Sequence, residues 1–301
     1  MIRTLIAGLA LLIAALPAAA QQKLSIGYIA TADSMPVVVA KEKGIFEKHK
    51  LDVTLVRIPL ASNVPSAVMS DSVQIGMGTG PMLLQTADGG LGLIGIAGVS
   101  NIGKASSIVS LVMRTGVKVD SPADLRGKKI GVPGFNSMMH VVFQKWLLDR
   151  KVAAGQLQMV EAIFPQMADL LKSGTLDGVI VLEPFRGRIV SENIGYKVSD
   201  FPIEVQDPIM AAYWMAKESW VKANAGVVTT FRAAYLEAID YALKNQPEMR
   251  GMEKAMLGAP SPLTPGYKGT LTAQDLEIFA KIGDELKMWR QKHDVNTLVW
   301  K

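Results

Sequence analysis

Short apolar runs rich in β-branched residues alternate with helix-like stretches along most of this chain. The first five runs cover residues 24–29, 52–58, 73–77, 91–99 and 108–113. This alternation predicts an α/β fold of stacked β-α units, with helices packed on the sheet, rather than a β-sandwich. A length of 301 residues, of which 49% are apolar, is enough for two lobes that each have their own core.

A second set of strand and helix signals begins at Ser121, which is followed by Pro122 and Asp124 in the pattern of a helix start. We expect the next strands at residues 128–132, 158–163, 176–182, 195–198 and 209–215. We expect helices at residues 137–150, 166–172, 226–245, 247–257 and 273–291. The Pro-rich stretch 258–266 is predicted to be a surface loop between the last two helices.

The strands at 108–113 and 209–215 lie where one set of units gives way to the other. They indicate that the chain leaves one lobe, builds a second and returns. We therefore predict a hinge of two crossover segments and a ligand cleft between the lobes. The predicted lobe 1 consists of residues 21–111 and 211–301, and the predicted lobe 2 of residues 112–210.

Residues 1–20 have the pattern of a secretory signal peptide. Arg3 precedes an apolar run at residues 5–16, and three alanines end at Ala20. The run is about 12 residues long, shorter than the roughly 20 needed to cross a bilayer. We predict cleavage after Ala20, with a retained N-terminal anchor as the alternative.

Composition narrows the location and the partners. The chain has no cysteine, so it has neither a disulfide framework nor a thiol for a lipid anchor, which favours a periplasmic protein that is not a lipoprotein. The net charge of +5 is spread over mixed charge pairs. Because no basic cluster with aromatic residues is present, no nucleic-acid partner is expected.

Four segments between Ile26 and Phe185 carry a family resemblance. They are GYIATADSMPVVVAKEKGIFEKHKLDVTLV, SDSVQIGMGTG, SPADLRGKKIGVPG and GTLDGVIVLEPF. In order and spacing they resemble the substrate-binding proteins of ABC importers in the nitrate, sulfonate and taurine group, which includes binders of thiamine-pyrimidine precursors.

This resemblance implies a periplasmic binding protein of type II, in which a two-segment hinge joins two Rossmann-like lobes and the ligand lies between them. It also implies hinge closure on a small molecule and delivery to an ABC permease in the inner membrane, which works with a cytoplasmic ATPase. We expect a monomer without a cofactor or metal and without catalytic residues.

Candidate ligand-binding residues follow from the rule that ligands of open α/β sheets sit at the carboxyl ends of strands. Five loops there supply Asp33, Ser34, Met35, Thr79, Gly80, Ser100, Asn101, Phe135, Asn136, Ser137, Glu183 and Phe185. Some of these have a structural alternative. Asp33 can instead cap the following helix, Gly80 can mark an ordinary turn, and Ser100 with Asn101 can simply end a strand.

The turn in IGVPGFNSMMHVVF, residues 130–143, presents helix amides that lack intrahelical partners and that can receive an anion or the polar edge of a neutral ring. The alternative is that Ser137 or Asn136 caps the helix. His140 lies off the apolar stripe of this helix, and we expect it to be partly exposed.

Glu183 ends a buried strand, where a carboxylate needs a partner. It pairs with Arg186 or Arg188, locks the hinge, or accepts an N–H group from a ligand. Phe185 is a candidate for stacking on that ligand.

The five loops contain no lysine or arginine but do contain Asp33 and Glu183. We therefore expect a small organic solute of sulfonate or carboxylate type, or a thiamine-related aminopyrimidine, rather than nitrate. An enzyme is not expected, because nucleophile-elbow, Walker and HExxH motifs are absent. A transcription regulator is not expected either, because the signal pattern occupies the place where such a protein would carry its helix-turn-helix. A sensory module that docks on a membrane receptor remains a third class.

Overall fold

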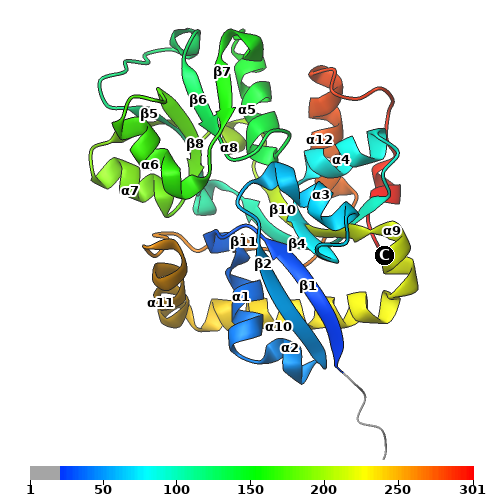
Figure 1. Ribbon diagram of the computed structural model, residues 1–301. Helices are drawn as coiled ribbons and strands as arrows, with labels where there is room; N and C mark the ends of the chain where they lie inside the picture. The colour runs from blue at the N-terminus through cyan, green and yellow to red at the C-terminus, as the bar shows by residue number, and fades with distance from the viewer. Residues whose placement is uncertain (1–20) are drawn as a thin grey trace, which may run out of the picture.

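The computed structural model describes residues 21–301, and the signal peptide predicted at residues 1–20 lies outside them. The described chain forms two α/β lobes, each built around its own β-sheet (Figure 1). No helix in this part of the chain is long and apolar enough to cross a membrane.

The first sheet has six strands in the order β11-β4-β10-β3-β1-β2. They are β1 (Gln22–Tyr28), β2 (Leu51–Arg57), β3 (Ile75–Gly78), β4 (Leu93–Ile102), β10 (Ile209–Lys217) and β11 (Gly266–Tyr267). β1 runs parallel to β2 and β3, whereas β10 runs antiparallel to β3 and β4. Alternate residues of a strand point to opposite faces, so Leu24 and Ile26 share one apolar core.

Helices cover both faces of this sheet (Figure 1). The core that contains Leu24 and Ile26 lies against α1 (Met35–Glu42), α2 (Ile45–Lys48) and α10 (Ala225–Lys244). The other face carries α3 (Val64–Met69), α4 (Gly80–Asp88) and α12 (Gln274–Glu285). Two more helices, α9 (Glu218–Ala223) and α11 (Gln246–Leu257), flank α10 along the chain.

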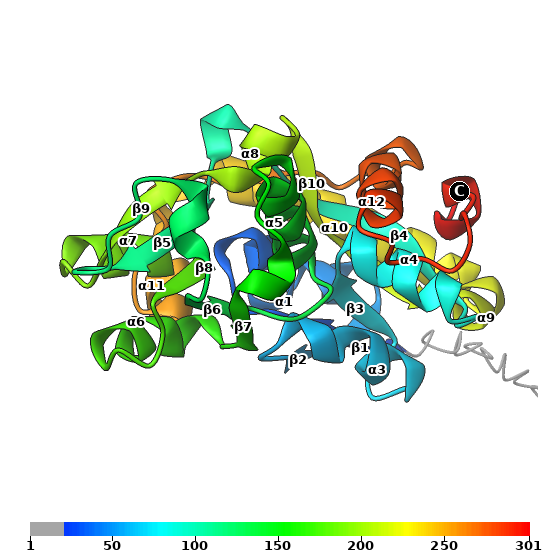
Figure 2. The same ribbon diagram turned by 90° about the horizontal axis from the view of Figure 1, so that it is seen from above.

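The second sheet has five strands in the order β7-β6-β8-β5-β9. They are β5 (Val109–Arg114), β6 (Lys129–Val132), β7 (Gln158–Glu161), β8 (Gly178–Leu182) and β9 (Gly195–Ser199), and their helices are α5 (Met138–Asp149), α6 (Phe164–Lys172), α7 (Phe185–Ser191) and α8 (Phe201–Val205). β6 is parallel to β7 and β8, whereas β5 is antiparallel to β8 and β9. Figure 2 shows α5 near the centre of the molecule, and this helix contacts α4 and α12 of the first lobe.

Two crossover segments join the lobes, as predicted: residues 103–108 between β4 and β5, and residues 200–208 between β9 and β10. They lie side by side, because the Lys104 amide donates a hydrogen bond to the Asp207 carboxylate at 3.2 Å. The lobe boundaries expected after residues 111 and 210 fall inside β5 and β10. Since β5 belongs to the second sheet and β10 to the first, we propose boundaries within the crossovers.

Two predictions about the C-terminal part are wrong in detail. The helix expected at 273–291 ends at Glu285, because Lys287 adopts a φ of 56° and the chain folds back until Trp289 packs on Gly283. The Pro-rich loop is not wholly on the surface. Ser261 is buried, and its amide donates to the Glu253 carboxylate at 2.8 Å.

Candidate ligand-binding cleft

A cavity of about 60 Å³ lies between the two lobes. Its wall includes residues from the loops after β1, β2, β3, β6 and β7, which is the edge where ligands bind in open α/β sheets. Most of the lining side chains are apolar, among them Met77, Ile108, Met139, Phe164 and Leu182. The polar side chains of the wall are those of Thr31, Asp33, Thr79 and Ser137.

The loop after β1 places Asp33 at the wall, with only 5% of its surface exposed. Its carboxylate accepts hydrogen bonds from the Thr31 hydroxyl at 2.5 Å and from the Ser100 hydroxyl at 2.9 Å. Burial raises the pKa of the Asp33 carboxyl, and the two hydroxyl donors oppose that rise. The cap position of α1 belongs to Ser34, and Met35 begins that helix in the core, so Asp33 does not cap it.

The loop after β3 makes a direct hydrogen bond between the two lobes. The Thr79 hydroxyl lines the cavity and accepts a hydrogen bond from the Met138 amide of the second lobe at 3.1 Å. Gly80 begins α4, and a Cβ there would lie 2.1 Å from the Phe279 ring and 2.4 Å from the Tyr213 hydroxyl. Close packing therefore accounts for this glycine.

Ser100 and Asn101 point to opposite sides of β4, as strand alternation requires. Ser100 is fully buried and bonds to Asp33 behind the cavity wall. Asn101 instead lines a separate groove beside α12, together with Gln274 and Lys281. The structure therefore separates Asn101 from the other candidate residues.

The turn after β6 has less free hydrogen-bonding capacity than predicted. The Phe135 amide donates to Glu161 at 2.7 Å, and the Asn136 amide donates to Nδ1 of His140 at 3.1 Å. Ser137 lines the cavity and caps α5, because its hydroxyl accepts the His140 amide at 3.3 Å. Phe135 is 38% exposed and meets the His140 ring edge-on.

The expectation of a partly exposed His140 is wrong. The ring is buried beneath this turn, where Nδ1 accepts from Asn136 and Nε2 lies 2.9 Å from the Gln144 amide group. Burial lowers the pKa of His140 to about 4, although the Glu161 carboxylate acts in the opposite direction. The imidazole is therefore neutral at neutral pH and serves as an acceptor within the turn.

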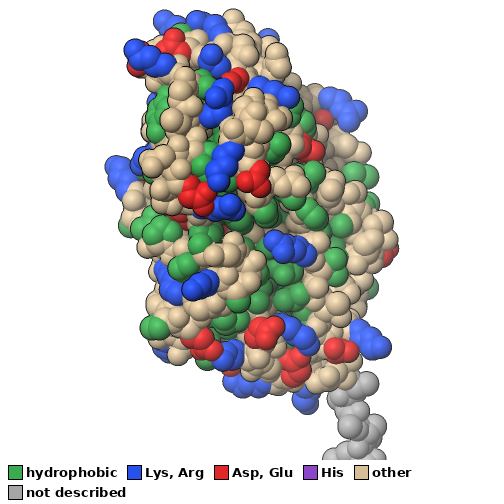
Figure 3. All heavy atoms as spheres, turned by 60° about the vertical axis from the view of Figure 1, so that its left-hand side comes forward, with side chains coloured by type: hydrophobic (Ala, Val, Ile, Leu, Met, Phe, Trp, Pro, Cys, Tyr) green, Lys and Arg blue, Asp and Glu red, His purple; other side chains and the backbone are tan. Residues whose placement is uncertain are grey.

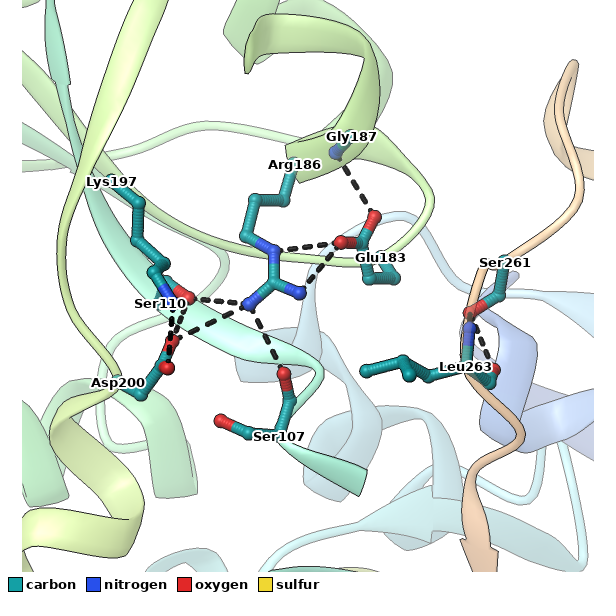
Figure 4. Close-up of polar contacts among 9 residues, drawn as sticks. All are labelled: Ser107, Ser110, Glu183, Arg186, Gly187, Lys197, Asp200, Ser261 and Leu263. Carbon is teal, nitrogen blue, oxygen red and sulfur yellow. Dashed lines mark hydrogen bonds and ion pairs between the residues drawn. The ribbon is translucent and has the colours of Figure 1, made fainter. Parts of the chain in front are cut away.

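Glu183 has the salt bridge that was one of its predicted alternatives (Figure 4). Its carboxylate accepts from the Arg186 guanidinium at 2.7 Å and from the Gly187 amide at 2.9 Å. Arg186 also donates to the Ser107 carbonyl at 3.1 Å, which ties the turn after β8 to the first crossover. Neither Glu183 nor Phe185 is at the cavity wall. Phe164 does line the cavity, and Phe185 stacks on it with ring centroids 5.6 Å apart.

Sequence reasoning missed several wall residues. Ala61 and Phe164 follow β2 and β7, so the rule that ligands sit at the carboxyl ends of strands applies to their loops as well. In the sequence, Pro59 and Pro165 mark where these two loops lie. Ala211 and Ala212 of β10 line the cavity as small residues within a buried strand. Their apolar pattern alone does not distinguish cavity wall from core.

The chain matches known proteins in sequence and in fold. A model of the NMT1-like family matches residues 17–255. A nitrate import ATP-binding protein, NrtC, from Synechocystis is 28% identical over 235 residues, which cover 72% of this chain and 34% of that protein. A nitrate/nitrite binding protein, NrtA, from Nostoc is 26% identical over 250 residues, covering 75% of this chain and 56% of the relative. The chain thus spans between a third and just over half of these relatives.

Among solved structures, the alkanesulfonate-binding protein SsuA from Xanthomonas axonopodis pv. citri superposes with a TM-score of 0.79 at 15% identity. The superposition covers 94% of this chain and 99% of that one. These matches confirm the predicted fold class, and they confirm the resemblance drawn from the four sequence segments.

Proposed function

Because the chain belongs to the NMT1-like family, we propose that it is the solute-binding component of an ABC importer. In this role it captures a small organic solute in the periplasm by closing its lobes and delivers that solute to a membrane permease. One observation carries the proposal: the cavity is lined by strand-end loops of both lobes, and within residues 21–301 two crossovers join those lobes. A solute that contacts both walls favours the closed arrangement.

Contacts across the cleft support closure as the working motion. Besides the bond between Thr79 and Met138, the Ala61 amide donates to the Pro133 carbonyl at 3.3 Å. Lys145 of α5 pairs with Glu285 of α12 at 3.0 Å. A cavity of about 60 Å³ is well below the roughly 300–1,000 Å³ of ordinary ligand pockets, so loading a solute requires the lobes to separate.

The apolar wall favours a solute with an apolar body. Figure 3 shows hydrophobic side chains gathered near the middle of one face, with basic and acidic side chains among and around them. We also propose that the protein is not an enzyme. The wall carries one ionisable side chain, Asp33, and the described residues hold no cluster of three metal-ligating side chains.

The test is a thermal-shift screen of the purified protein against small organic acids, sulfonates, amines, pyrimidines and nitrate. A solute at 100 times its Kd stabilises the folded state by about 2.7 kcal/mol, which such a screen detects. Each hit is then followed by small-angle scattering, where the radius of gyration is expected to fall. Stabilisation without compaction would contradict closure. Co-purification with a sensor kinase, instead of a permease, would favour the sensory alternative.

A further inference from the structure

Buried carboxylates in this protein follow one rule with one exception. Among the described residues, three acidic side chains are buried: Asp33, Glu183 and Glu253. Glu183 pairs with Arg186 and Glu253 pairs with Arg250, each three residues away along the chain. Such pairing is the usual requirement for burying a charge.

Asp33 is the exception. Its oxygens accept from the hydroxyl groups of Thr31 and Ser100, and no lysine, arginine or histidine of the described chain forms an ion pair with it. A carboxylate has acceptor sites for about four hydrogen bonds, so these two donors leave room for others. Asp33 is also the only one of the three that lies at the cavity wall.

The rest of the wall does not favour an anion. Neither lysine nor arginine lines the cavity in residues 21–301. Two amides in the first turn of α5 are also engaged: that of Met138 donates to Thr79 and that of His140 to Ser137. A sulfonate or carboxylate placed here would meet the Asp33 carboxylate without a compensating cation, at a cost that rises in a water-poor site.

On the premise of the solute-binding function proposed above, we infer that the solute is a small organic cation, a protonated amine or amidine. Its N–H groups bond to Asp33, and its apolar body lies against Met77, Met139 and Phe164. The solute thereby supplies the charge partner that the chain provides to Glu183 and Glu253 but not to Asp33. Charge-assisted hydrogen bonds of this kind are roughly twice as strong as neutral ones.

The experiment compares probes that share one ring and differ in charge. Benzylamine and benzamidine are the cations, and benzoate and benzenesulfonate are the anions. Calorimetric titration of the wild-type protein is expected to show binding of at least one cation at least tenfold tighter than either anion. Asp33→Asn is expected to weaken cation binding at least tenfold. Glu253→Gln, which alters a buried carboxylate on α11 away from the cavity, is the matched control and should retain binding.

The outcomes separate the inference from the function on which it rests. If an anion binds more tightly than both cations and compacts the protein, the solute-binding function stands and the cation inference is wrong. The cation inference is equally wrong if Asp33→Asn binds a cation as wild type does. If nothing in the panel or the wider screen binds or compacts the protein, both fail together. The comparison of the wild-type probes needs no variant, so it decides the question even if Asp33→Asn does not fold.

Discussion

Gly134 is the position where one methyl group tests lobe closure most directly. It lies in the turn after β6, against the loop after β2 of the first lobe. An added Cβ would lie 2.8 Å from the Ser62 amide nitrogen, 3.0 Å from the Ala61 Cβ and 3.2 Å from the Ala61 amide nitrogen. Two of these three atoms are backbone, so no side-chain rotation relieves the clash. Gly134→Ala is therefore expected to push the two lobes apart at this contact.

The size of the effect follows from the clash. Overpacking by one methyl group costs about 1–3 kcal/mol. Separation of the lobes relieves the clash but breaks the bond from the Ala61 amide to the Pro133 carbonyl. The closed arrangement therefore loses about 1–3 kcal/mol relative to the open one. If the solute binds the closed form, its Kd rises roughly 5- to 140-fold, since 1.4 kcal/mol corresponds to a factor of ten.

The assay is calorimetric titration of the best solute from the screen, combined with small-angle scattering. We expect Gly134→Ala to bind more weakly and to keep a larger radius of gyration at equal saturation. The matched control is Gly155→Ala in the same lobe, where nothing lies within 4 Å of the added Cβ. Gly134 has a φ of 158°, which adds a local cost in both arrangements, so urea unfolding is measured in parallel.

Binding by Gly134→Ala within threefold of wild type, together with normal compaction, would refute the reasoning. In that case the contact between Gly134 and the loop after β2 is not part of the closed, solute-bound form.

Three further expectations concern charge. Burial raises the pKa of the Asp33 carboxyl, so the stability contributed by its protonated form is fully present below the ordinary value of 3.8 and is lost as pH rises through the folded-state pKa. In urea unfolding, Asp33→Asn should therefore become more stable relative to wild type as pH rises above about 4. His140 has its pKa lowered to about 4, so wild type loses stability as pH falls from 6.5 towards 4, and His140→Gln should flatten that loss; an imidazole NMR signal that titrates near 6.5 would contradict this. Glu285→Gln removes the pair with Lys145 between the lobes and should weaken solute binding about two- to fivefold at low salt, with no difference from wild type at high salt.

The sequence predicted the lobe architecture well because hydrophobic periodicity is local. The strands expected at 52–58 and 195–198 appear as β2 and β9 within a residue or two, and the helix at 226–245 is α10. The prediction of a helix at 273–291 was wrong at its end, because that end depends on Trp289 packing back on Gly283. Such a contact between neighbouring turns of chain leaves no periodic signal.

The site was predicted less completely, because side-chain direction depends on partners that are distant in sequence. Asp33 meets Ser100, 67 residues away, and Thr79 meets Met138, 59 residues away. Glu183 was recognised as needing a partner, and the salt bridge to Arg186 was among its alternatives, since that partner is local. Asn101 was grouped with Ser100, although adjacent strand residues face opposite sides.

The antiparallel strands have a consequence for the order in which the chain can fold. In the first sheet β10 lies between β3 and β4, which do not pair with each other. In residues 22–102, the edges of β3 and β4 that pair with β10 therefore stay open until residues 209–217 are added. The second sheet is contiguous, from Val109 to Ser199, and needs nothing that follows it. We expect a chain emerging from its N-terminus to complete the later lobe first and then close the earlier one by inserting a strand into its middle.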